Sequence, residues 1–83
     1  MKHAGKEALD ALEDLLEQVR QQPSLKERTR GSFYRKSAGF LHFHEDPAGL
    51  FADLKLDGKF KLFPVNTEEE RAELLAKVVA EIQ

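Results

Sequence analysis

Cysteine and tryptophan are absent from this chain of 83 residues, and no long hydrophobic run occurs in it. Without cysteine, the chain has no disulfide, no thiolate metal ligand and no cysteine nucleophile. The N-terminal segment carries acidic residues throughout its apolar pattern, so we expect neither a signal peptide nor a membrane span, and a cytoplasmic location. Hydrophobic residues make up 41% of the chain, which is enough for one small core and predicts a single domain over residues 1–83.

The net charge of −2 is unevenly distributed along the chain. Most acidic residues lie in segments 1–22 and 66–83, whereas segment 26–61 has eight basic residues against five acidic ones. A nucleic-acid-binding domain usually has a stronger basic excess on one face, so this balance does not favour a nucleic-acid partner. The basic run around Tyr34 is the part that such a partner would use, but its alternation is also typical of a solvated strand.

Two segments have the apolar spacing of amphipathic helices. The first runs from Lys6 to Gln21 and ends before Pro23, with the apolar stripe Ala8, Leu9, Leu12, Leu15, Leu16 and Val19. The second begins after Pro64, where Asn66 and Thr67 form overlapping capping boxes with the glutamates that follow. Its apolar stripe is Ala72, Leu75, Val78, Val79 and Ile82, with Leu74 beside it.

Alternating apolar residues between the two helices predict antiparallel strands. Residues 24–31 leave two alternatives open: a short helical turn capped by Ser24 and Glu27, or an edge strand with Leu25, Glu27 and Thr29 on one face. The predicted fold is α+β, with an N-terminal helix, an antiparallel meander of three or four strands and a C-terminal helix. Both helices are expected to pack on one face of the sheet.

The first hairpin has two possible registers. If Ser37-Ala38-Gly39 forms a three-residue loop, Phe33 lies opposite Phe43 and Tyr34 lies opposite His42. A two-residue loop instead places Tyr34 in the core and Phe33 beside His44. We favour the first register, which puts both phenylalanines on the core face.

The two later turns set the rest of the register. Asp46-Pro47-Ala48-Gly49 has the residues of a type I turn and pairs Phe43 with Ala52, Leu41 with Leu54, His44 with Phe51 and His42 with Asp53. For the last turn we expect the three-residue loop Leu56-Asp57-Gly58, because a two-residue loop would set Leu54 opposite Lys61. It pairs Leu54 with Phe60, Ala52 with Leu62, Asp53 with Lys61 and Phe51 with Phe63.

These registers divide the sheet into two faces. The core face is predicted to carry Phe33, Leu41, Phe43, Leu50, Ala52, Leu54, Phe60 and Leu62. The opposite face is predicted to carry the candidate ligand-binding or interface residues Tyr34, His42, His44, Phe51, Asp53, Lys61 and Phe63, with Ser32 beside them. An exposed face of this kind often marks an interface, so we expect a binding or self-association module, and a homodimer would bury Phe40, Phe51 and Phe63.

An enzyme or metal site is the alternative on the same face. Tyr34, His42 and Asp53 suit a small-molecule pocket, because a carboxylate orients an imidazole for proton transfer. No nucleophile motif or glycine-rich loop accompanies them. His42 and His44 project from one strand face and suit zinc or a similar ion, with Glu45 or Asp46 as the candidate further ligand. Glu45 is expected to point to the opposite face, whereas Asp46 in the turn could reach back. No cofactor is otherwise predicted, and the catalytic and metal residues stay open.

The His-x-His spacing resembles the first half of a cupin metal motif, but the expected glutamate is replaced by Ala48 or Gly49 and the chain is too short for a cupin barrel. The segment His44 to Leu54 resembles a His-Asp-Gly-Leu-Ala-Asp stretch of small bacterial luciferase-like domains, with departures at Pro47, Ala48 and Phe51. The whole chain is similar to short uncharacterised bacterial α+β proteins. None of these resemblances implies an activity or a site residue.

Overall fold

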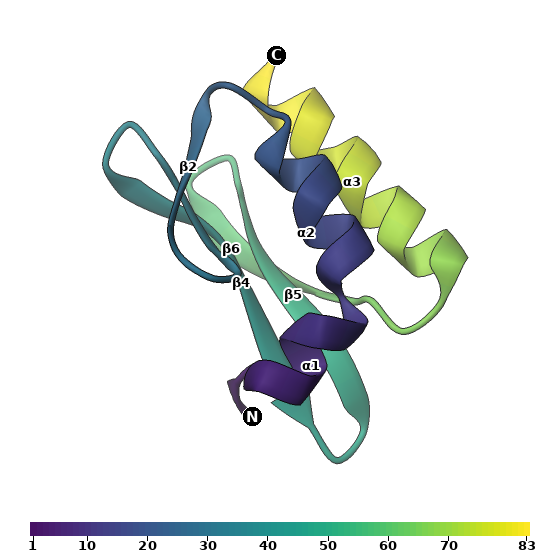
Figure 1. Cartoon of the computed structure of the whole chain (residues 1–83). Coiled ribbons are helices and arrows are strands. Elements are labelled where there is room, and N and C mark those ends of the chain that lie inside the picture. Colours follow the sequence, from purple (N-terminus) through teal and green to yellow (C-terminus); the bar gives the residue numbers. More distant parts are fainter.

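In the computed structural model, which describes residues 1–83, a six-stranded antiparallel sheet carries three helices on one face (Figure 1). Along the chain the elements are β1 (Lys2–His3), α1 (Lys6–Ala11), α2 (Glu13–Arg20), β2 (Leu25–Thr29), β3 (Ser32–Arg35), β4 (Ala38–Asp46), β5 (Gly49–Leu56), β6 (Lys59–Pro64) and α3 (Glu68–Ile82). β2 to β6 are neighbours in chain order, and β1 pairs with β4. The predicted α+β fold is confirmed, although the sheet has more strands than the three or four expected because β1 and β2 also pair.

The first predicted helix is divided at Leu12 into α1 and α2. The Leu12 N–H lies 3.1 Å from the carbonyl oxygens of both Ala8 and Leu9, so the helix tightens locally. The apolar stripe continues through this point, with Leu9, Leu12, Leu15, Leu16 and Val19 all buried. None of the three helices combines the length and the apolar composition that a membrane crossing requires.

α3 begins with the predicted capping box. The Thr67 hydroxyl accepts a hydrogen bond from the Glu70 N–H at 3.1 Å, and the Glu70 carboxylate accepts one from the Thr67 N–H at 3.1 Å. Asn66 does not cap a helix but holds the backbone of Leu50 through its amide. The buried side of α3 differs from the predicted stripe, because Leu74 and Val78 are its buried residues and Ala72 is exposed.

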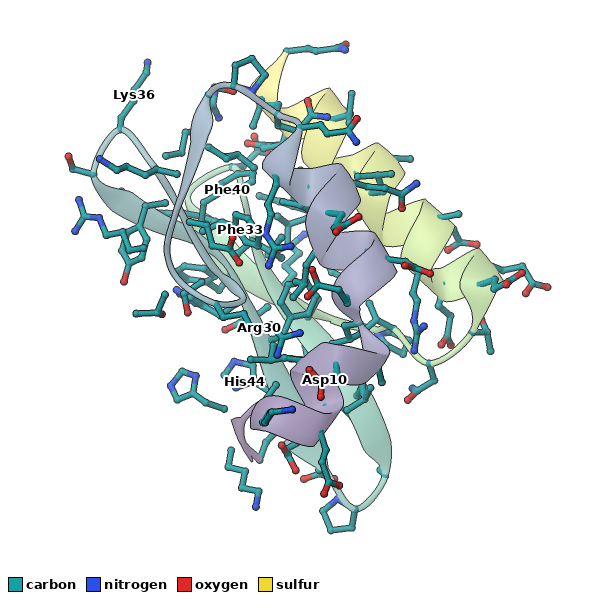
Figure 2. The ribbon with its side chains drawn as sticks, viewed as in Figure 1. Asp10, Arg30, Phe33, Lys36, Phe40 and His44 are labelled. Carbon is teal, nitrogen blue, oxygen red and sulfur yellow. The ribbon has the colours of Figure 1, made fainter.

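The core lies between the helices and the sheet. Phe33 and Phe40 point from the sheet toward the helices in Figure 2. Phe40 is therefore a core residue, contrary to the predicted interface position. Val65, which the sequence pattern did not single out, is fully buried between β6 and α3. The buried hydrophobic residues are Leu9, Leu12, Leu15, Leu16, Val19, Phe33, Phe40, Leu41, Phe43, Ala52, Leu54, Val65, Leu74 and Val78.

Residues 25–29 form the edge strand β2, which resolves the two alternatives for this segment. Glu27 faces the helices and accepts hydrogen bonds from Arg20 and from the Gly31 N–H. Arg30 reaches α1, where its guanidinium lies 2.8 Å from the Asp10 carboxylate, as the two labelled side chains in Figure 2 illustrate. These charged contacts attach the β2–β3 hairpin to the helices.

The β3–β4 hairpin differs from the predicted register. Its loop is Lys36-Ser37, and both residues have positive φ (51° and 69°), as a two-residue type I′ turn requires. Phe33 pairs with Leu41, but Tyr34 pairs with Gly39, because a β-bulge intervenes. The predicted pairs of Phe33 with Phe43 and Tyr34 with His42 are wrong. The bulge gives β4 one extra residue, and Phe40 and Leu41 are consecutive buried residues as a result.

The β4–β5 register is confirmed at all four predicted pairs, Phe43 with Ala52, Leu41 with Leu54, His44 with Phe51 and His42 with Asp53. The Asp46 carboxylate accepts a hydrogen bond from the Ala48 N–H at 3.1 Å and stabilises the turn. The central part of the sheet is therefore the part that the sequence predicts correctly.

The β5–β6 register is the one that the sequence analysis rejected. Asp57 and Gly58 form a two-residue loop with φ of 51° and 80°, so Leu54 lies opposite Lys61 and Asp53 lies opposite Leu62. The burial argument fails here because β6 is an edge strand, where the lysines extend into solvent instead of entering the core. The predicted pairs Asp53–Lys61 and Phe51–Phe63 are wrong, and all four β6 assignments change face.

Candidate functional site

The helix-free side of the sheet carries a mixed aromatic and charged surface, which we call the open face. It consists of Tyr34, His42, His44, Phe51, Asp53, Lys55, Phe60 and Leu62, which alternate with core residues along β3 to β6. Tyr34, His42, His44, Phe51 and Asp53 were predicted on this face and lie there. Lys61 and Phe63 were also predicted here, but they lie on the helix side, where Phe63 packs against the core and under Lys77.

Three rings cross the open face as a continuous row, which we call the aromatic row: Tyr34, His42 and Phe60. The rings of Tyr34 and His42 meet edge to face with centroids 6.2 Å apart, and those of His42 and Phe60 stack at 5.5 Å with planes 26° apart. A cation lies over each end, with Arg28 4.6 Å from the Tyr34 centroid and Lys55 5.7 Å from the Phe60 centroid. Together with these two cations, the row spans all five strands from β2 to β6.

Gly39 makes the stack of His42 on Phe60 possible. A Cβ atom at this position would lie 3.3 Å from Cε1 of His42 and 3.9 Å from Cζ of Phe60. Both rings therefore cover a patch of bare backbone, an arrangement in which an aromatic side chain shields a strand glycine. The sequence contains a signal for this contact in Asp57-Gly58, because a two-residue loop at that dipeptide brings Phe60 to the open face.

A second group of side chains lies beside the aromatic row. The Nε2 atom of His44 is 3.7 Å from Oδ2 of Asp53, and the rings of His3 and His44 are 5.1 Å apart. Burial lowers the pKa of His42 below its ordinary value of 6.5, and the Asp53 carboxylate opposes this effect. His3 had no expected role, but the pairing of β1 with β4 places it on the open face.

The predicted catalytic group is only partly assembled. Asp53 lies opposite His42 in the register but approaches His44 with its carboxylate, and no hollow of the surface is lined by Tyr34, His42, His44 or Asp53. A substrate would therefore find the proton-exchanging side chains on a flat surface. This geometry excludes less water than an enzyme pocket usually does.

The predicted metal ligands do not converge. Glu45 turns to the helix side, where its carboxylate accepts a hydrogen bond from the Gly5 N–H at 2.6 Å, and Asp46 is engaged in its turn. No three His, Asp or Glu side chains are arranged so that they could hold a metal ion. His42 and His44 thus lack a third ligand from this chain.

Charge is divided between the two layers of the molecule. α1 and α2 carry five acidic residues and α3 carries five more. The open face has one acidic residue, Asp53, together with Lys55 and the neighbouring cations Lys26 and Arg28 of β2. The small net charge therefore conceals an acidic helix layer and a basic sheet face.

A hollow of about 370 Å³ lies at the end of the sheet, where the β3–β4 and β5–β6 hairpins approach the end of α3. Arg35, Lys36, Lys55 and Glu81 are among the residues that line it. Lys36 stands at the tip of its hairpin and points away from the body of the protein (Figure 2). The hollow is open to solvent.

No known protein family, curated protein or solved structure matches the chain. The open face is therefore the feature of this protein from which a function can be inferred.

Proposed function

We propose that this protein is a small binding module that docks its partner on the open face. The observation that supports this function most strongly is the exposure of Phe60 (43%) and Leu62 (47%), which lie at alternate positions of β6 on that face. Large apolar side chains that remain accessible next to fixed aromatic rings are typical of a docking surface. The helix side offers no comparable surface, because none of the large apolar side chains of the helices is exposed.

The rings of this surface are held in place before any partner binds. Each ring of the aromatic row is attached to a strand with paired neighbours, and each contacts the next ring or a cation. A preformed surface loses little conformational freedom when a partner binds, which favours affinity. A small-molecule ligand would have to be flat to contact several of these rings at once.

Association with a second copy is the second candidate. An 83-residue domain buries a modest share of its surface, and a homodimer would cover the apolar side chains that β6 leaves exposed. Such a dimer would bury Phe60 and Leu62, in place of the Phe40, Phe51 and Phe63 named from the sequence. An enzyme or zinc role receives less support, because the open face lacks a pocket and a third metal ligand.

Sedimentation equilibrium and amide NMR on a concentration series test both candidates. The double variant Phe60→Ser and Leu62→Ser removes the exposed apolar groups, and Ala72→Ser with Ala76→Ser makes a matched change at exposed positions of α3. Self-association that only the first variant abolishes would identify the partner as a second copy.

A foreign partner is tested with two probes on the monomer, a single-stranded oligonucleotide and an acidic peptide. Binding should shift the amide signals of Tyr34, His42 and Phe60 and leave those of α1 to α3 in place. If neither a second copy nor either probe shifts the open-face signals, the proposed function is wrong.

A further inference from the structure

The basic hollow and the aromatic row are parts of one continuous surface. Lys55 contributes to both, because its ammonium group lies over the Phe60 ring and its side chain lines the hollow. Gly39 also belongs to both, since it lies beneath His42 and Phe60 and forms part of the wall of the hollow. A ligand on the row therefore has cations within reach at its end.

The excess of basic residues on this surface favours an anionic partner. Lys26 lies opposite Tyr34, Arg28 and Lys55 lie over the two ends of the row, and Lys36 belongs to the adjoining hollow. Asp53 is the acidic residue on the same face. At the hollow, Glu81 accepts a hydrogen bond from the Asp57 N–H, and its backbone carbonyl accepts one from Arg35, each at 3.3 Å. Lys36 and Lys55 have no carboxylate partner within 4 Å, so they remain available to a ligand.

A second copy of this chain fits the surface less well. Stacking two open faces would bring Arg28 and Lys55 of one copy near the same cations of the other, and like charges at an interface are unfavourable. An acidic peptide would satisfy the cations but would leave three adjacent rings without matching groups. Nucleic acid combines anionic phosphates with flat bases, which are the two groups that this surface accommodates.

We propose that the open face binds single-stranded nucleic acid, with bases stacked on Tyr34 and Phe60 and phosphates held by Arg28, Lys36 and Lys55. This proposal rests on the proposed binding function and names its partner. Arg28 and Lys55 cover ring faces in the free protein. An incoming base replaces each cation over its ring, and the displaced cation pairs with the adjoining phosphate. A duplex would keep its bases stacked inside and could not make these contacts.

Tyr34 provides a direct probe of this binding. It is the only tyrosine and tryptophan is absent, so the intrinsic fluorescence of the protein comes from the aromatic row. Oligothymidylate added at low salt should quench Tyr34 fluorescence until the signal saturates. The logarithm of the binding constant should fall with the logarithm of salt concentration, with a slope of about −0.7 for each phosphate contact.

Matched variants separate stacking from charge. Phe60→Ala should weaken binding of a fluorescently labelled oligothymidylate at least about fivefold, the lower limit for one base on one aromatic ring. Lys36→Gln with Lys55→Gln should weaken binding and reduce the steepness of the salt dependence. Lys6→Gln with Lys77→Gln changes the net charge equally on the helices and should leave the affinity unchanged. A denaturation curve for each variant verifies folding.

Four results would overturn the proposal: no binding of oligothymidylate at low salt, equal binding of the corresponding duplex, equal competition by inorganic polyphosphate or an acidic peptide, or equal weakening by the Lys6 and Lys77 variant. Failure of this proposal is distinguishable from failure of the binding function. If the peptide or a second copy still shifts the Tyr34, His42 and Phe60 amides, the open face is a docking surface with another occupant. If nothing shifts them, both proposals fail.

Discussion

The imidazole of His42 stacks on the phenyl ring of Phe60 with centroids 5.5 Å apart, although the two residues come from strands that do not pair with each other. The contact spans β5, where Lys55 lies opposite Phe60 with its ammonium group 5.7 Å from the centroid of the ring. The stack therefore depends on the backbone beneath it and on the register of β6. Each of these dependences can be tested.

Replacing Gly39 by alanine should disturb the stack without unfolding the protein. The new Cβ would lie 3.3 Å from Cε1 of His42, so the imidazole has to move by a few tenths of an ångström. Alanine also reduces the freedom of the unfolded chain, and the two effects should leave the free energy of unfolding within about 1 kcal/mol of its original value. Ring-current shifts of the His42 protons report the displacement. Unchanged shifts would show that Gly39 does not support the stack.

Stability should decrease as the pH falls through 6.5. Burial disfavours the charged imidazolium of His42 and lowers its pKa in the folded state below the ordinary value of 6.5. The unfolded chain therefore takes up a proton first, and protonation favours unfolding until the pH passes below the folded-state pKa. Urea denaturation at several pH values measures this dependence. His42→Gln should flatten the curve in this window, and an equally steep curve in that variant would assign the effect to other groups.

Phe33→Ala and Phe60→Ala should differ widely in their effect on stability. Phe33 is 1% exposed between the sheet and the helices, so its removal leaves a cavity and should cost about 3–5 kcal/mol. Phe60 is 43% exposed on the open face, and its removal should cost less than about 1 kcal/mol. Comparable losses for the two variants would mean that Phe60 lies in the core, as the rejected three-residue loop would place it.

The β3–β4 turn should tolerate replacement by a sequence that suits it better. Lys36 and Ser37 both have positive φ, which is unfavourable for residues with a Cβ, whereas Asn-Gly adopts type I′ turns readily. Lys36→Asn with Ser37→Gly should raise the free energy of unfolding by about 1 kcal/mol. Gly58→Ala is the opposite change at the other hairpin, where φ is +80° and no atom lies nearby, and it should lower stability. Destabilisation by the first variant would contradict the assigned turn.

The sequence predicts the helices and the centre of the sheet because their signals are local and mutually consistent. Thr67 and Glu70 form the capping box at the start of α3. Between Leu41 and Leu54, core and open-face residues alternate on both sides of a single turn, and the proline and glycine of that turn fix the length of its loop. His42 and Asp53 were paired correctly for this reason.

The errors have two physical causes. The turn at Lys36-Ser37 contains neither glycine nor asparagine, and a β-bulge at Phe40 has no local signature, so the first register could not be derived from turn chemistry. At Asp57-Gly58 the dipeptide correctly indicates a two-residue loop, but the expected burial of Phe60 and Leu62 favours a three-residue loop instead. That expectation assumes a covered strand, whereas β6 is an edge with two exposed lysines. The aromatic row was missed because Phe60 was assigned to the wrong face.

The alternation along β6 also affects how readily the free edge of the sheet pairs with another strand. Phe60 and Leu62 project to one side, and Lys59 and Lys61 project to the other. If the β6 edges of two copies paired in parallel and in register, Lys59 and Lys61 of one copy would lie beside the same lysines of the other, and this repulsion disfavours the pairing. Pro64 ends the strand without an N–H group to donate. The strand can thus present apolar side chains to a partner on one face while its free edge disfavours pairing with a second copy.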